Sequence, residues 1–164
     1  TSIKDSNGVY IIPAFVGLGA PYWDMNSRGS IFGLTRGTNK NHIIRAALES
    51  IAYQVNDLYT AILNDTDSSS TYLKVDGGAT QNNFLMQFQA DILNKEIIRP
   101  ENIETTALGA ALLAGVGSGF WKPSNDFSII LDIDSKFNPS INDQKRSKMI
   151  SGWNDAINRT ITKG

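Results

Sequence analysis

The stretch Tyr72-Leu73-Lys74-Val75-Asp76-Gly77-Gly78-Ala79 predicts a short strand that ends in a turn with two adjacent glycines. Residues Gln81–Leu93 follow, with apolar side chains at the spacing of one helix face: Phe84, Leu85, Phe88 and Ile92. Glu96–Arg99 then predict a second short strand before Pro100. A strand, a helix and another strand in this order indicate parallel strands joined by a crossover helix, so we expect an α/β architecture.

Longer helices flank this unit on both sides. Lys40–Leu63 carries one apolar face (Ile44, Leu48, Ile51, Val55, Leu58 and Ile62), and Asn39 or Thr38 can cap its start. Asn142–Thr162 carries a second stripe: Ile150, Trp153, Ile157 and Ile161. Thr105–Val116 is apolar on most sides, and such a helix is usually buried. Val9–Ile12 and Ile31–Leu34 predict further strands, and Asp67–Thr71 predicts a surface loop.

Composition excludes several classes of function. The 164 residues have a net charge of −1, which argues against a nucleic-acid or membrane-surface partner because both need clustered Lys and Arg. No apolar run approaches the ~20 residues of a membrane span. Cysteine is absent and there is a single histidine, so disulfides, zinc–thiolate sites, thiol nucleophiles and multi-histidine metal sites are ruled out.

The glycine pair is the strongest chemical signal in the sequence. Two residues without Cβ, between a strand and a helix, permit close approach of another group, and a helix start favours an anion such as a nucleotide phosphate. A tight turn without a ligand explains the pair equally well, because neither a Walker A loop nor a dinucleotide fingerprint is present.

Five nearby or isolated residues allow both a structural and a functional interpretation. Asn82 can reach a base or ribose, although helix capping is the simpler role. Asp76 lies where ligands bind in open α/β sheets, and we expect it to orient the turn rather than act as a base. His42 is expected to cap or pack its helix, and Tyr22 and Trp23 to be core aromatics of a large loop.

Several motifs, in the same order, resemble the FGGY carbohydrate kinases. They are Pro13–Asp24, Arg28–Gly37, His42–Glu49, Val75–Ala79, Asn82–Leu85 and Thr106–Ala111. Within Pro13–Asp24, the run Gly-Leu-Gly-Ala-Pro is similar to the glycerol kinases rather than to the pentulose and gluconate kinases. The resemblance covers about Gly8–Trp121 densely and the last helix more loosely.

The resemblance implies part of an RNase H-like domain of the actin/Hsp70/hexokinase ATPase fold. It implies an ATP-dependent phosphotransferase that uses Mg²⁺ and converts glycerol to sn-glycerol 3-phosphate, as a cytoplasmic, homo-oligomeric enzyme. Gly78 and Asn82 match the family's nucleotide-binding positions, and Gly77 and Ala79 line the same turn. No residue here matches the family's catalytic aspartate or its glycerol contacts.

Residues 1–164 are therefore expected to form the carboxy-terminal part of the second, nucleotide-binding domain, with the amino-terminal domain absent. We expect this piece alone to be inactive. We also expect part of the apolar face of Ile44, Leu48, Ile51 and Val55 to meet water without its upstream neighbours. The alternatives are a non-catalytic nucleotide-binding or assembly module with the same half-fold, and a sister FGGY sugar kinase.

Overall fold

The computed structural model describes residues 3–66, 70–122 and 132–162. Its elements follow one another along the chain in this order: β1 (Tyr10–Ile12), β2 (Ser30–Phe32), α1 (Lys40–Asp65), β3 (Tyr72–Lys74), the 3-10 turn η1 (Gly78–Gln81), α2 (Asn83–Leu93), β4 (Glu96–Pro100), α3 (Thr105–Gly117), β5 (Ile133–Phe137) and α4 (Asp143–Thr160). Most predicted elements are present within a few residues of their expected bounds. Asp67, Ser68 and Ser69 of the predicted surface loop lie outside the described residues.

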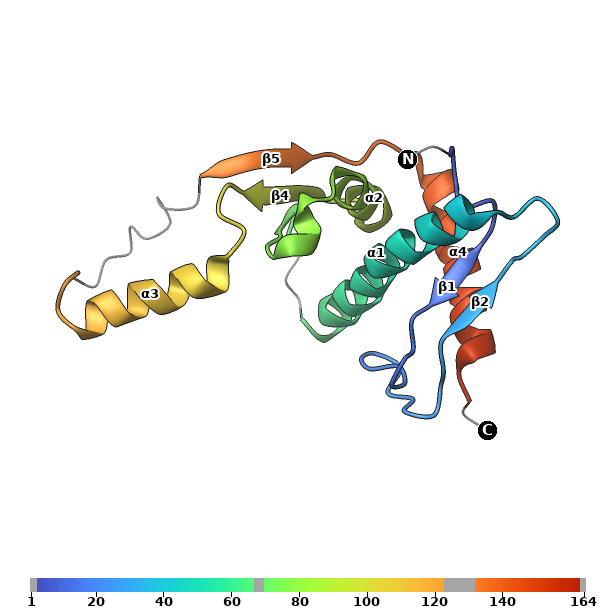
Figure 1. Cartoon of the computed structure of the whole chain (residues 1–164), viewed down its shortest axis with the longest axis horizontal. Helices are drawn as coiled ribbons and strands as arrows, with labels where there is room; N and C mark the ends of the chain where they lie inside the picture. Colours follow the sequence, from blue (N-terminus) through green and yellow to red (C-terminus); the bar gives the residue numbers. More distant parts are fainter. Residues whose placement is uncertain (1–2, 67–69, 123–131, 163–164) are drawn as a thin grey trace.

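A three-stranded sheet in the order β3-β4-β5 carries the glycine turn (Figure 1). Strands β3 and β4 are parallel, with Leu73 opposite Ile97, and α2 makes the crossover between them. This confirms the predicted α/β unit. β5 was not predicted, and it pairs with β4 in the antiparallel direction, with Phe137 opposite Ile97. Within the described residues β3 pairs with β4 alone, so its outer edge is open.

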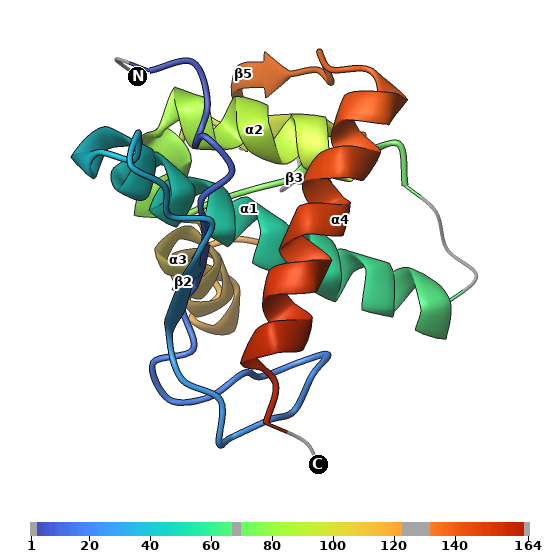
Figure 2. The ribbon, with the colours of Figure 1, turned by 90° about the vertical axis from the view of Figure 1, so that its right-hand side faces the viewer.

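The core lies where α1, α2 and α4 meet the small antiparallel β1–β2 ribbon (Figure 2). Tyr53 of α1 stacks on Trp153 of α4, with ring centroids 5.0 Å apart, and meets the edge of Phe88 of α2 at 5.4 Å. Trp153 and Ile157 are fully buried. The stripe predicted for the last helix is therefore the one that faces the core.

The apolar stripe of α1 points the other way. The buried face of this helix consists of small and polar residues around Tyr53, among them Ala46, Ala52 and Asp57. Ile44 and Ile51 are 59% and 40% exposed, as expected for part of this face, whereas Leu48 and Val55 are half-buried.

α3 corrects one prediction. It forms over the expected residues, but none of them is buried, and Leu113 is 75% exposed. Figure 1 shows this helix projecting away from α1 and α4. A helix that is apolar on most sides needs a partner to cover it. Within the described residues, Trp121 packs on Gly115, but no helix or strand covers α3.

The loop before β2 corrects another prediction. Tyr22 is half-buried and packs on the core, and its hydroxyl donates to the buried Asp57 carboxylate over 2.8 Å. Trp23, in contrast, is 71% exposed, and its backbone has a positive φ of 51°. The loop is closed instead by the buried Asp24, whose carboxylate accepts hydrogen bonds from Ser27 and from the backbone and side chain of Thr162.

Candidate nucleotide-binding site

The turn after β3 is closed by its own backbone. Gly77 has φ 86° and ψ 164°, a conformation that favours glycine. Its N–H donates to the Ile103 carbonyl over 2.8 Å. Its carbonyl accepts from the Thr80 N–H over 3.0 Å and from the Thr80 hydroxyl over 2.7 Å. Gly77 is therefore a glycine for reasons internal to the fold.

Gly78 has no such internal reason. A Cβ built there would meet nothing within 4 Å, and its φ lies outside the left-handed region. Gly78 and Ala79 are both exposed, and among the described residues their N–H groups have no hydrogen-bond acceptor. The turn thus presents two adjacent donors to open space, which suits an external hydrogen-bond acceptor.

Asn82 has the structural role that was considered simpler. The predicted helix Gln81–Leu93 is divided: η1 occupies Gly78–Gln81, and α2 begins at Asn83. Asn82 separates the two because its ψ of 99° is not helical, and its side-chain oxygen accepts from the Leu85 N–H over 3.2 Å. The start of α2 is therefore capped by Asn82, and the N–H groups without an acceptor among the described residues lie before it, at Gly78 and Ala79. The side-chain nitrogen of Asn82 has no partner in the described part of the chain.

Asp76 ties the turn to the next helix. Its carboxylate accepts a hydrogen bond from the hydroxyl of Thr105, the first residue of α3. A cavity of about 520 Å³ opens beside it, lined by Lys74, Val75, Asp76, Ile98, Pro100, Thr105 and Ile133. This contact fits the expected orienting role of Asp76.

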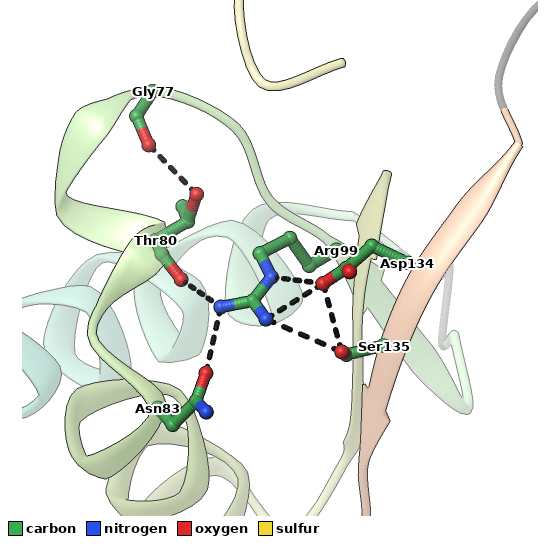
Figure 3. A network of polar contacts seen from close by, with 6 residues as sticks. All are labelled: Gly77, Thr80, Asn83, Arg99, Asp134 and Ser135. Carbon is green, nitrogen blue, oxygen red and sulfur yellow. Dashed lines mark hydrogen bonds and ion pairs between the residues drawn. The ribbon is translucent and has the colours of Figure 1, made fainter. Parts of the chain in front are cut away.

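Arg99, at the end of β4, is the residue that the sequence analysis missed (Figure 3). Its guanidinium joins the turn on one side to Asp134 and Ser135 of β5 on the other. Hydrogen bonds from Ser135 and Arg99 hold the pKa of the Asp134 carboxyl below its usual value. A single arginine before a proline carries no motif, so no sequence signal pointed to it.

His42 has the expected structural role. The side chain of Asn39 accepts from the Asn41 and His42 N–H groups, and the His42 ring accepts from the Asn39 N–H over 3.1 Å. This reciprocal capping of α1 gives the His42 ring a structural role.

The described residues do not form a metal site made of protein side chains alone. Nowhere within residues 3–66, 70–122 and 132–162 do three histidine, aspartate or glutamate side chains gather closely enough to hold a metal. In the same ranges, no helix is long and apolar enough to cross a bilayer.

Comparisons with known proteins agree with the motifs. Residues 2–118 match the FGGY family of carbohydrate kinases, C-terminal domain. A glycerol kinase of Shewanella oneidensis is 59% identical over 160 residues, which are 98% of this chain and 32% of that protein. The chain thus spans about a third of the length of the curated relatives it matches.

Solved structures show the same fold. The crystal structure of Plasmodium falciparum glycerol kinase with ADP superposes with a TM-score of 0.86 at 38% identity, covering 99% of this chain and 32% of that one. The gluconate kinase of Lactobacillus acidophilus gives 0.77 at 25% identity, covering 94% and 31%.

Proposed function

Because the chain belongs to the FGGY family of carbohydrate kinases, we propose that it is the carboxy-terminal portion of an ATP-dependent glycerol kinase. The observation that carries this proposal is the 59% identity to a glycerol kinase along 98% of the chain. The solved glycerol kinase is also nearer in sequence than the gluconate kinase, at 38% against 25%, which favours glycerol over a sister sugar as the substrate.

The glycine turn is the proposed contact with ATP. The N–H groups of Gly78 and Ala79 have no acceptor in the described chain, Gly77 and Gly78 leave open space, and the Asn82 amide nitrogen is available next to them. These groups suit the polar edge of a nucleotide, and the Plasmodium relative was solved with ADP. In the reaction, the turn would hold and orient ATP while its γ-phosphoryl group moves to a terminal hydroxyl of glycerol.

The remaining chemistry is assigned to other parts of the enzyme. Phosphoryl transfer needs positioning, charge stabilisation and a group that receives the hydroxyl proton. No residue of this chain is proposed for that last role. Mg²⁺ is proposed as the ion that accompanies ATP. Its ligands would come mainly from the ATP phosphates and water, because no group of three acidic or histidine side chains gathers among the described residues.

The proposed partner is the amino-terminal part of the same kinase. Three features support this partner: the exposed stripe of α1, the uncovered α3 and the open edge of β3. Each is an apolar or hydrogen-bonding surface that stabilises a fold only when it is covered. The proposal also includes a homo-oligomeric enzyme that works in the cytoplasm, where ATP is plentiful.

A chimeric enzyme tests the proposal. This chain would replace the matching third of the Shewanella oneidensis kinase, and ATP-dependent phosphorylation of glycerol, xylulose and gluconate would be measured. We expect activity with glycerol and none from the 164-residue chain alone. A folded chimera that is inactive with glycerol would argue against a glycerol kinase, because the rest of the chimera supplies the glycerol contacts. One that binds ADP but phosphorylates nothing would identify a non-catalytic module.

A further inference from the structure

We propose that Arg99 is a positioning residue for the nucleotide, which acts by holding the Gly77–Gln81 turn in place from the sheet side. The inference rests on the proposed function, because it assumes that this turn contacts ATP. It adds a residue that contacts the turn through the Thr80 carbonyl.

The Arg99 guanidinium uses all three of its nitrogens. Nη1 donates to the Thr80 carbonyl over 2.6 Å and to Asn83 Oδ1 over 2.9 Å. Nε and Nη2 contact Asp134 Oδ2 at 2.7 and 2.6 Å, and Nη2 also donates to Ser135 Oγ over 3.2 Å. The side chain is only 11% exposed. One side chain thus joins β4, β5, the turn and the first residue of α2, as Figure 3 shows.

These contacts lead directly to the proposed nucleotide contacts. Thr80, whose carbonyl Arg99 holds, donates both its N–H and its hydroxyl to the Gly77 carbonyl. Asn83, the other residue held, directly follows Asn82. Moving the guanidinium would therefore displace the glycine turn and Asn82 together, while the hydrophobic core around Trp153 lies elsewhere.

A lysine cannot replace this arginine. Four hydrogen bonds and an ion pair to four residues need donors in a fixed planar fork, whereas an ammonium is a compact charge on a flexible stem with three donors. Asp134 supplies the countercharge on the β5 side, so the positive charge of Arg99 is already paired. This pairing favours a role through geometry over direct attraction of phosphate.

Arg146 is a matched control at the other end of α2. Its side chain is also 11% exposed and pairs with an aspartate, Asp143. It donates to the Asp91 carbonyl over 2.8 Å and to Asn94 Oδ1 over 2.9 Å, close to the carboxyl end of α2. Removing it should destabilise the fold in a similar way without touching the turn.

The experiment compares Arg99→Lys, Arg99→Gln, Asp134→Asn and Arg146→Gln in the Shewanella chimera. The measurements are KM for ATP, KM for glycerol, kcat, the affinity for a fluorescent ADP analogue, and amide hydrogen exchange at Thr80 and Asn82. We expect both Arg99 variants to weaken ATP and ADP binding by about fivefold or more, the loss expected when buried hydrogen bonds to a charged group are removed, with glycerol KM unchanged within about twofold. Asp134→Asn should weaken nucleotide binding less strongly. Amide hydrogen exchange at Thr80 and Asn82 should accelerate in all three of these variants.

Three results would overturn the inference. They are normal nucleotide affinity in Arg99→Gln, full rescue by Arg99→Lys, and an equal loss of ATP affinity in Arg146→Gln. An unmutated chimera that neither phosphorylates glycerol nor binds ADP would instead refute the proposed function, and the inference with it. The two failures are therefore distinguishable in one set of proteins.

Discussion

Replacing Gly78 by valine in the chimera should weaken the binding of ATP without lowering the stability of the fold. The structure gives no reason for glycine there, because a Cβ would meet nothing within 4 Å and no positive φ is required. We therefore expect the free energy of unfolding to change by no more than about 0.5 kcal/mol, as for an ordinary surface substitution. Only a bound ligand would meet the added side chain.

The expected loss of affinity follows from the donors that the turn presents. The N–H groups of Gly78 and Ala79 are the two without an acceptor among the described residues of the turn. A valine side chain would hold the nucleotide away from both, and each hydrogen bond is worth about 1 kcal/mol net. Their loss predicts weaker ATP binding by at least tenfold, or about 1.4 kcal/mol, with glycerol affinity nearly unchanged.

Calorimetric titration with ADP and steady-state kinetics would measure this loss, and urea unfolding would check the fold. Gly19→Val is the control, because Gly19 also has open space around its Cβ and lies in a different loop. Gly77→Ala gives the contrast: its φ of 86° predicts a loss of stability of about 1–2 kcal/mol before any ligand is added. An ATP affinity of Gly78→Val within twofold of the unmutated protein, or an equal loss of affinity for glycerol, would refute the reasoning.

Three further predictions concern the fold. Trp153→Phe removes the indole N–H that donates to the buried Asp57 carboxylate over 2.7 Å, so we expect about 1–3 kcal/mol of destabilisation in urea unfolding, and no change would show that water replaces the donor. The pKa of Asp24 is held below its usual 3.8 mainly by the hydrogen bond from the Thr162 N–H. The Asp24 carboxylate therefore stabilises the fold above pH 3.8, and this contribution is lost as the pH falls below 3.8. Asp24→Asn should flatten the dependence of stability on acid pH in unfolding measurements, and an unchanged slope would contradict the prediction. The isolated chain should self-associate through its uncovered surfaces, whereas a monodisperse monomer in light scattering, with cooperative unfolding above about 45 °C, would show that it needs no partner.

Local signals predicted much of this structure. The β3–α2–β4 unit could be predicted because the short apolar runs around Leu73 and Ile97 are separated by a glycine turn and a helical apolar pattern. The helix α1 could be predicted from its long apolar period and its Asn39 cap. β5 was missed because its pairing depends on β4 rather than on its own residues. The exposure of α3 was missed because its apolarity predicts that a partner is needed without saying where that partner lies.

The candidate site was only partly predictable for the same reason. Gly77 and Gly78 stand out in the sequence, since adjacent glycines after a strand are rare without a conformational or contact requirement. Arg99 does not stand out, because its partner Asp134 lies 35 residues away and no spacing connects them. Asn82 was identified, but its capping bond appears only when the break between η1 and α2 is known.

The stacking of Tyr53 on Trp153 has a consequence during synthesis on the ribosome. The bond between Trp153 and Asp57, in the same core, joins residues 96 positions apart. At about 5–20 residues per second, roughly 5–20 s separate the emergence of the two partners. During that interval α1 has left the ribosome while Tyr53 on one face and the isoleucines on the other face are both uncovered. The nascent chain is therefore most in need of a chaperone before the last helix arrives, and tryptophan fluorescence at position 153 would report the moment at which that need ends.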